Sequence, residues 1–135
     1  TIKSIHSKLV SVKFGKSKNL RNDKYLIDIS KQIKLYSLGK LKKFRLQYSL
    51  LGTPLQIKIW NELSKIKYGQ TTSYGEIAKK IKTSPRYVGN VCGQNNLLII
   101  IPCHRVIKSD GALGGFSGLG GIKLKKKLLN LEVNV

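Results

Sequence analysis

Apolar and polar residues alternate in two stretches near the start of this 135-residue chain. SIHSKLVSVKF, beginning at Ser4, and KYLIDIS, beginning at Lys24, both follow the period of two that is typical of half-buried strands. The KNLRND segment between them resembles a turn, and the basic segment after them, residues 31–50, has only weak periodicity. The pattern predicts a small, β-rich α/β subdomain over residues 1–48, in which the lone His6 is structural.

From Gly52 onward the apolar residues take a helical spacing. In GTPLQIKIWNELSKIKYG, one helical face carries Leu55, Ile59, Trp60, Leu63 and Ile66. Thr53 is placed to cap this helix, Pro54 suits its first position, and Gly69 is the expected end.

Two short helices are predicted next. In TTSYGEIAKKI, Ser73 and Glu76 have the spacing of a capping box. After a break of about three residues, Ser84 caps a second helix that Pro85 opens, with the sequence RYVGNVCGQN. This layout is typical of a helix-turn-helix, although many other helical hairpins share it.

The remaining C-terminal sequence predicts a buried strand or extended segment at LLIII, residues 97–101, and an amphipathic helix at IKLKKKLLNLE. Between them lies the glycine-rich stretch GALGGFSGLGG. It lacks the GK[ST] of a phosphate-binding loop, so a loop folding over a site is the better interpretation. We therefore expect an α+β fold with a mainly helical C-terminal domain over residues 52–135.

Composition adds a strong positive charge to this outline. The chain has 26 Lys plus Arg against 6 Asp plus Glu, a net charge of +20. Such a surface suits a polyanion such as nucleic acid, because each neutralised phosphate releases counterions. The alternative is that scattered lysines only confer solubility, as in proteins from AT-rich genomes.

Other classes of protein fit the sequence poorly. No apolar run approaches the ~20 residues of a membrane span, so we expect a protein of the cytoplasm, or of the nucleus if the source is eukaryotic. Two cysteines make no disulfide framework, and no CxxC or HxxxH pair suggests zinc. Neither a metal nor a cofactor is expected.

The candidate chemistry lies in IPCHRV, where Cys103 and His104 are adjacent. A cysteine attacks as its thiolate, which needs a base nearby. At a sharp turn after Pro102, His104 could act on Cys103 through a water, with a carboxylate orienting the imidazole. Of the six acids, Glu132 is the most available. The alternative is a structural pair, because an arbitrary Cys-His dipeptide is more often a buried cysteine beside a core histidine.

The segment from Gly52 to Glu132 resembles the C-terminal domain of the O6-alkylguanine-DNA alkyltransferases. The matching pieces are GTPLQIKIW, YGQTTSYGEIA, SPRYVG, IPCHRVI, GGFSG and KKKLLNLE, in this order. PCHRV is the active-site signature of that family. The resemblance implies a methylated-DNA–protein-cysteine methyltransferase that flips O6-alkylguanine out of duplex DNA. It would transfer the alkyl group irreversibly to its own cysteine, once per molecule.

The resemblance also implies roles for single residues. Cys103 would accept the alkyl group, His104 and Glu132 would form its activating relay, and Asn95 would be the hinge between recognition helix and active-site turn. The catalytic set is completed by Tyr74, which also contacts DNA. The other expected DNA-binding residues are Ser84, Arg86, Tyr87, Gly89 and Asn90, with Arg86 as the finger that fills the gap left by the base. The expected substrate pocket consists of Pro102, Val106, Phe116 and Ser117.

We expect a monomer whose partner is double-stranded DNA containing O6-alkylguanine, with O4-alkylthymine left open. A working relay should lower the pKa of the Cys103 thiol below the ~8.5 of a free cysteine. Two other functions compete: a non-catalytic alkyltransferase-like damage sensor or regulator, a class that lacks the acceptor thiol, and an unrelated cysteine hydrolase. The chain departs from the family at Tyr87, Asn96 and Phe116, where alanine, proline and tyrosine are usual, and is about two residues longer after Ser117.

Overall fold

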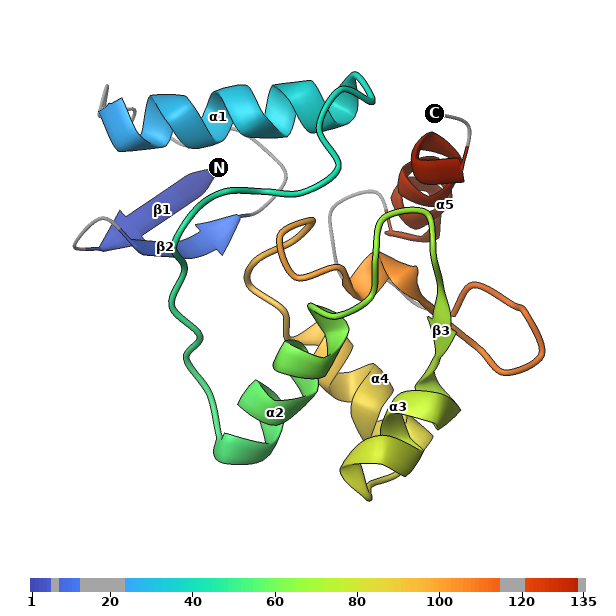
Figure 1. Cartoon of the computed structure of the whole chain (residues 1–135). Coiled ribbons are helices and arrows are strands. Elements are labelled where there is room, and N and C mark those ends of the chain that lie inside the picture. Colours follow the sequence, from blue (N-terminus) through green and yellow to red (C-terminus); the bar gives the residue numbers. More distant parts are fainter. Residues whose placement is uncertain (6–7, 13–23, 115–120, 134–135) are drawn as a thin grey trace.

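The structure, a computed structural model, describes residues 1–5, 8–12, 24–114 and 121–133 (Figure 1). A small antiparallel hairpin comes first, and helices predominate in the later described ranges. The expected α+β fold, with β-structure at the N-terminus and a mainly helical C-terminal part, is confirmed.

The N-terminal part is a hairpin covered by one helix. Strand β1 (Ile2–Ile5) pairs antiparallel with β2 (Lys8–Val12), with an irregularity between Lys3 and Ser4. Helix α1 (Lys24–Ser37) lies along the hairpin (Figure 1). The strand predicted for KYLIDIS is therefore wrong, because these residues form the first half of α1. The apolar face that Tyr25, Ile29, Ile33 and Tyr36 make at helical spacing outweighs the short alternation.

Helix α2 (Pro54–Leu63) begins as predicted and ends early. The Thr53 hydroxyl accepts from the Gln56 backbone, and the Gln56 side chain accepts from the Thr53 backbone, a complete capping box. The predicted end at Gly69 is wrong, because the helix stops where the Ser64 hydroxyl donates to the Trp60 carbonyl. Gly69 instead takes a left-handed φ of 79° in the following turn.

The predicted helix pair is present as α3 (Tyr74–Ile81) and α4 (Pro85–Gly93). The Ser73 and Ser84 hydroxyls cap the two helices, each accepting from a backbone N–H three residues on at 3.1 Å. The capping box at Ser73 is only half formed, because the Glu76 carboxylate accepts from the Thr72 hydroxyl. The apolar faces of α3 and α4 pack together, as in a helix-turn-helix, and the Trp60 indole bonds the Val91 carbonyl.

The strand or extended segment predicted for LLIII is wrong. Residues 97–101 form a buried turn, with isolated bridges from Leu97 to Val12 and from Leu98 to Ile101, and Ile99 has a φ of 73°. A continuous apolar run indicates burial but does not distinguish a strand from a buried turn. The short 3-10 helix η1 (Cys103–Arg105) follows, then β4 (Val106–Ile107), which pairs in parallel with β3 (Thr72–Ser73). The predicted final helix is α5 (Gly121–Val133).

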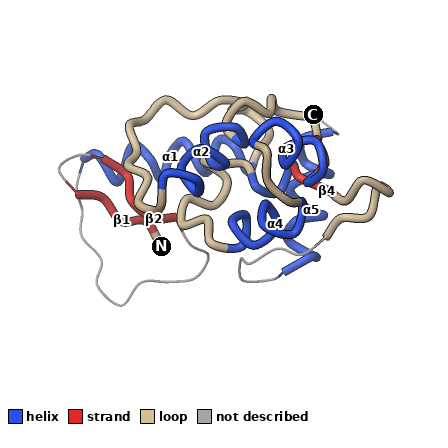
Figure 2. Tube along the Cα trace, turned by 90° about the horizontal axis from the view of Figure 1, so that it is seen from below, coloured by secondary structure: helices blue, strands red, loops and turns tan. Residues whose placement is uncertain are grey.

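The main core joins the N-terminal part of the chain to the later helices. Leu9, Val12 and Ile29 belong to the same buried cluster as Ile59 and Val91. In Figure 2 the hairpin lies at one end of the molecule, while α3, α4 and α5 gather at the other. The division into domains 1–48 and 52–135 stays a prediction. No helix in the described ranges is long and apolar enough to cross a membrane.

Candidate active site

The predicted reactive turn is buried. Pro102, Cys103, His104, Arg105 and Val106 are all shielded from solvent. The turn is held by backbone bonds from Cys103 N–H to the Ile101 carbonyl, 2.8 Å, and from Arg105 N–H to the Pro102 carbonyl, 3.0 Å. This 3-10 geometry is the sharp turn after proline that lets neighbouring side chains leave in different directions.

Asn95 ties the end of α4 to this turn. Its side-chain Nδ2 donates to the Ile101 carbonyl at 2.9 Å and lies 3.2 Å from Cys103 Sγ. Its Oδ1 accepts from the Leu97 backbone N–H at 2.8 Å. The buried amide therefore contacts the thiol directly and spans the segment between α4 and the cysteine.

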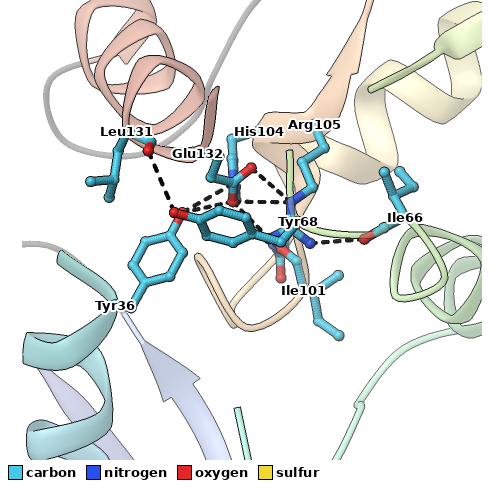
Figure 3. A network of polar contacts seen from close by, with 9 residues as sticks. Tyr36, Ile66, Tyr68, Ile101, His104, Arg105, Leu131 and Glu132 are labelled. Atoms are coloured by element: carbon cyan, nitrogen blue, oxygen red, sulfur yellow. Dashed lines mark hydrogen bonds and ion pairs between the residues drawn. The ribbon is translucent and has the colours of Figure 1, made fainter. Parts of the chain in front are cut away.

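His104 and Glu132 lie in contact on the other side of the turn. His104 Nε2 is 2.8 Å from Glu132 Oε1, and both side chains are buried (Figure 3). Burial would raise the pKa of Glu132, but hydrogen bonds from His104 and Arg105 lower it to about 2. Burial also lowers the pKa of His104, so the imidazole is neutral at pH 7 and can accept a proton.

The other ring nitrogen of His104 is the one suited to that proton. Because a carboxylate only accepts, the Nε2–H donates to Glu132 and Nδ1 carries the lone pair. Nδ1 is buried and has no hydrogen-bond partner among the described residues. The residue that follows the cysteine thus offers a neutral base on the free edge of its ring.

No role was predicted for Arg105 from the sequence, although it directly follows His104. Its Nε lies 3.0 Å from each Glu132 oxygen and its Nη2 lies 2.6 Å from Oε1. Its Nη1 donates to the Ile66 carbonyl at 2.8 Å, and its guanidinium lies over the Tyr68 ring. A buried guanidinium with this geometry locks the carboxylate in place.

The Cys103 thiol does not have the low pKa that was expected. Burial raises its pKa, while the Asn95 hydrogen bond and the charge of Lys125 act in the lowering direction. The prediction was wrong because it considered mainly the nearby base. It underestimated the free-energy cost of placing the thiolate charge in an apolar site. The resting cysteine is a neutral thiol, so its proton must leave during the reaction.

Lys125 is a second buried charge close to the thiol for which the sequence predicted no role. It is fully buried, and its Nζ donates to the Val106 carbonyl at 2.6 Å and to the Tyr74 hydroxyl at 3.2 Å. Burial lowers the pKa of Lys125 and raises that of Tyr74 to about 12. The spacing along the sequence could have indicated its burial. Lys125, Leu128 and Glu132 fall on one face of α5, and that face is buried.

A cavity of about 650 Å³ opens beside the thiol. Its lining includes Cys103, Tyr74, Arg86, Gly89, Cys92 and Gly114. Gly114 has a φ of 71°, and a Cβ there would lie 2.9 Å from the Tyr74 hydroxyl, so only glycine fits. Arg86 is exposed at the start of α4, so this helix and the thiol border the same cavity.

The other predicted site residues are more scattered. Ser84 and Asn90 are exposed on and beside α4, and Tyr87 is partly buried against the main core. Pro102 and Val106 are buried, but neither lines the cavity at Cys103; Pro102 lines a separate groove on the side of Arg105. The assignment of Pro102 and Val106 to the substrate pocket stays a prediction. Phe116 and Ser117 lie outside the described residues.

Comparison with known proteins agrees with this geometry. Residues 54–134 match the family model of the 6-O-methylguanine DNA methyltransferase, DNA binding domain. A methylated-DNA–protein-cysteine methyltransferase of Methanosarcina acetivorans is 40% identical over 115 residues, covering 84% of this chain and 72% of the relative.

Solved structures extend the likeness to the whole fold. OGT of Mycobacterium tuberculosis, in complex with DNA, superposes with a TM-score of 0.87 at 36% identity, covering 98% of this chain and 85% of that one. Atl1 of S. pombe, in complex with damaged DNA containing O6-carboxymethylguanine, is more distant: TM-score 0.53, 27% identity, 62% of this chain and 79% of that one. With the matched segment spanning the thiol, its histidine and its carboxylate, the chain belongs to the 6-O-methylguanine DNA methyltransferase family.

Proposed function

We propose that this protein repairs DNA by transferring an alkyl group from O6 of a guanine to Sγ of its own Cys103. The observation that carries the proposal is that Cys103 and the first residues of α4 line one cavity. A reactive thiol and a DNA-recognition helix that share a cavity suit a reaction on a base taken out of the duplex.

The proposed step uses a thiol that starts neutral. The Cys103 proton passes through a water to Nδ1 of His104. The other ring nitrogen of His104 already donates its Nε2–H to Glu132. The sulfur then attacks the alkyl carbon, forming a C–S bond as the bond from carbon to guanine O6 breaks. Guanine leaves with a proton from Tyr74, whose raised pKa keeps its hydroxyl protonated until then. The thioether product is not hydrolysed, so each molecule reacts once.

Delivery of the base to Cys103 falls to α4 in this proposal. Extruding a base costs a few kcal/mol, and a side chain wedged into the gap offsets part of that cost. Arg86 is exposed at the second position of α4 and lines the cavity, so it is our choice for the wedge. The excess of lysine and arginine would hold the phosphates. We place the reaction where DNA is found, in the cytoplasm of a prokaryotic cell or in a eukaryotic nucleus.

Intact mass spectrometry tests the transfer directly. The protein is incubated with a duplex containing one O6-methylguanine, and we expect one added methyl group per molecule, mapped to Cys103, with no second turnover. Cys103→Ser should gain no methyl group and still bind the duplex within several-fold, because lysine and arginine supply most of the affinity.

Cys92→Ser is the matched control, since Cys92 is the other free, buried cysteine and lines the same cavity. This variant should react like the parent chain. A methyl group found on Cys92, or repeated turnover, would overturn the assignment. Binding of the modified duplex with no adduct at all would favour the damage-sensor function instead.

A further inference from the structure

The side chain of Tyr36 reaches the buried charges behind Cys103 from a distant part of the chain. Tyr36 lies near the end of α1 and is only 1% exposed. Its hydroxyl donates to Glu132 Oε1 at 2.8 Å and lies 3.4 Å from His104 Nε2 (Figure 3). A buried tyrosine hydroxyl usually has a hydrogen-bond partner, and here that partner is the Glu132 carboxylate.

The ring of Tyr36 is held so that the hydroxyl cannot turn away. It packs against Phe44, with centroids 5.5 Å apart, and edge-on against Tyr68 at 6.0 Å. Burial raises the pKa of Tyr36 far above its ordinary range, and the Glu132 carboxylate raises it further. The hydroxyl therefore stays a donor at every pH at which the protein works.

The position of this hydroxyl matters for the histidine. Glu132 Oε1 receives Tyr36, His104 and Arg105 together. Every donor to a carboxylate makes it less basic, and a less basic carboxylate supports a protonated imidazole less strongly. The Tyr36 oxygen also lies beside the Nε2–H of His104, where its lone pairs favour the tautomer with a free Nδ1.

We infer that Tyr36 is a positioning residue of the alkyl-transfer site, supplied by the N-terminal part of the chain. By holding Glu132 and the Nε2 edge of His104, it keeps Nδ1 unprotonated and directed to receive the thiol proton. The N-terminal part thus contributes to the chemistry as well as to the core.

Other charges that act on His104 must be held constant in a test. They are Glu132 and Lys125 from α5 and Arg105 from η1. Tyr36→Phe leaves all three in place and removes only one oxygen. Tyr68→Phe is the matched control, because its hydroxyl, in the same aromatic cluster, bonds the Leu131 carbonyl at 3.4 Å.

Nitrogen-15 NMR of the histidine rings gives a readout independent of catalysis. The chain has only two histidines, so His6→Gln leaves the His104 signals alone in the spectrum. We expect an unprotonated Nδ1 in the parent chain. In Tyr36→Phe the titration midpoint of His104 should rise by about half to one pH unit, since the carboxylate loses a donor. In Tyr68→Phe it should not move.

A second experiment measures reaction kinetics, and unlike the NMR titration it rests on the proposed function. In single-turnover reactions with benzylguanine, the acidic limb of the pH–rate profile should move upward with the His104 midpoint in Tyr36→Phe only. A His104 midpoint unchanged in Tyr36→Phe, or moved equally in Tyr68→Phe, overturns the inference. A shifted midpoint in a protein that forms no Cys103 adduct would instead overturn only the proposed transfer.

A third variant covers the case in which Tyr36→Phe does not fold. Placing 3-fluorotyrosine at residue 36 keeps the ring and hydroxyl but makes the phenol a stronger donor. The same reasoning then predicts a shift of the opposite sign, with the His104 midpoint lowered. A raised or unchanged midpoint would overturn the inference.

Discussion

The two sides of Cys103 are built in different ways. On one side, which we call the relay side, Tyr36, His104, Arg105 and Glu132 are buried and joined by hydrogen bonds of 2.6–3.4 Å. On the other, the cavity side, the exposed Arg86 and the side-chain-free Gly89 border about 650 Å³ of open space.

This difference separates two kinds of requirement. Buried charges are tolerated only when each is paired, so the relay side must be complete before any substrate arrives. The cavity side must remain open, because the proposed substrate is a whole base with part of its backbone. Substitutions on the relay side should therefore change stability and pH dependence, and substitutions on the cavity side should change the handling of duplex DNA.

The largest expected effect is that of Glu132→Gln on stability. Removing the negative charge leaves the buried Arg105 guanidinium without its counter-ion, which costs about 3 kcal/mol in the free energy of unfolding. Urea denaturation at pH 7 measures this loss. A loss below about 1 kcal/mol would mean that the buried pair contributes little, and the contrast between the two sides would fail.

The same variant makes a pH control. The pKa of Glu132 is about 2 in the folded protein and near its ordinary value of 4.5 when unfolded. Because the folded value is the lower one, its stabilisation is present above pH 4.5 and is lost as the pH falls toward 2. The fall in stability over this window should be smaller in Glu132→Gln than in the parent chain.

Arg86→Ala should show the opposite behaviour on the cavity side. We expect repair of a methylated duplex to slow about 10- to 100-fold, since only the duplex requires extrusion of the base. Reaction with free benzylguanine and the free energy of unfolding should change little, because Arg86 is exposed. Lys79→Ala removes one exposed charge from α3 and serves as the control for charge alone. Equal slowing on both substrates would assign Arg86 a structural role.

The smallest effect is predicted for Gly89→Ala. A Cβ at this position would meet Tyr74 at an ordinary 3.9 Å, and alanine favours the helix by up to about 1 kcal/mol. We expect slightly raised stability together with several-fold slower duplex repair, because the methyl group narrows the cavity side. Unchanged repair in Gly89→Ala would mean that DNA does not approach this face closely.

Much of the fold could be predicted from local sequence. Caps at Thr53, Ser73 and Ser84 placed the starts of α2, α3 and α4, because a cap depends on a few neighbouring residues. The PCHRV motif identified the thiol and its histidine. The errors arose where a short pattern is compatible with two structures. Over its seven residues, KYLIDIS fits a strand and a helix equally well. The apolar run LLIII indicates burial but does not specify a backbone conformation.

The sequence by itself indicated the candidate thiol and its neighbouring histidine, Cys103 and His104, and it determined where α3 and α4 begin. Only the tertiary structure decided how the thiol is surrounded. Tyr36 and Glu132 are 96 residues apart, and no local pattern can report a hydrogen bond between them. Burial also decided the charge states, since the same fold that pairs Arg105 with Glu132 raises the pKa of Cys103. Spacing along a chain specifies neighbours on one element, whereas solvent exclusion depends on every element that packs around a site.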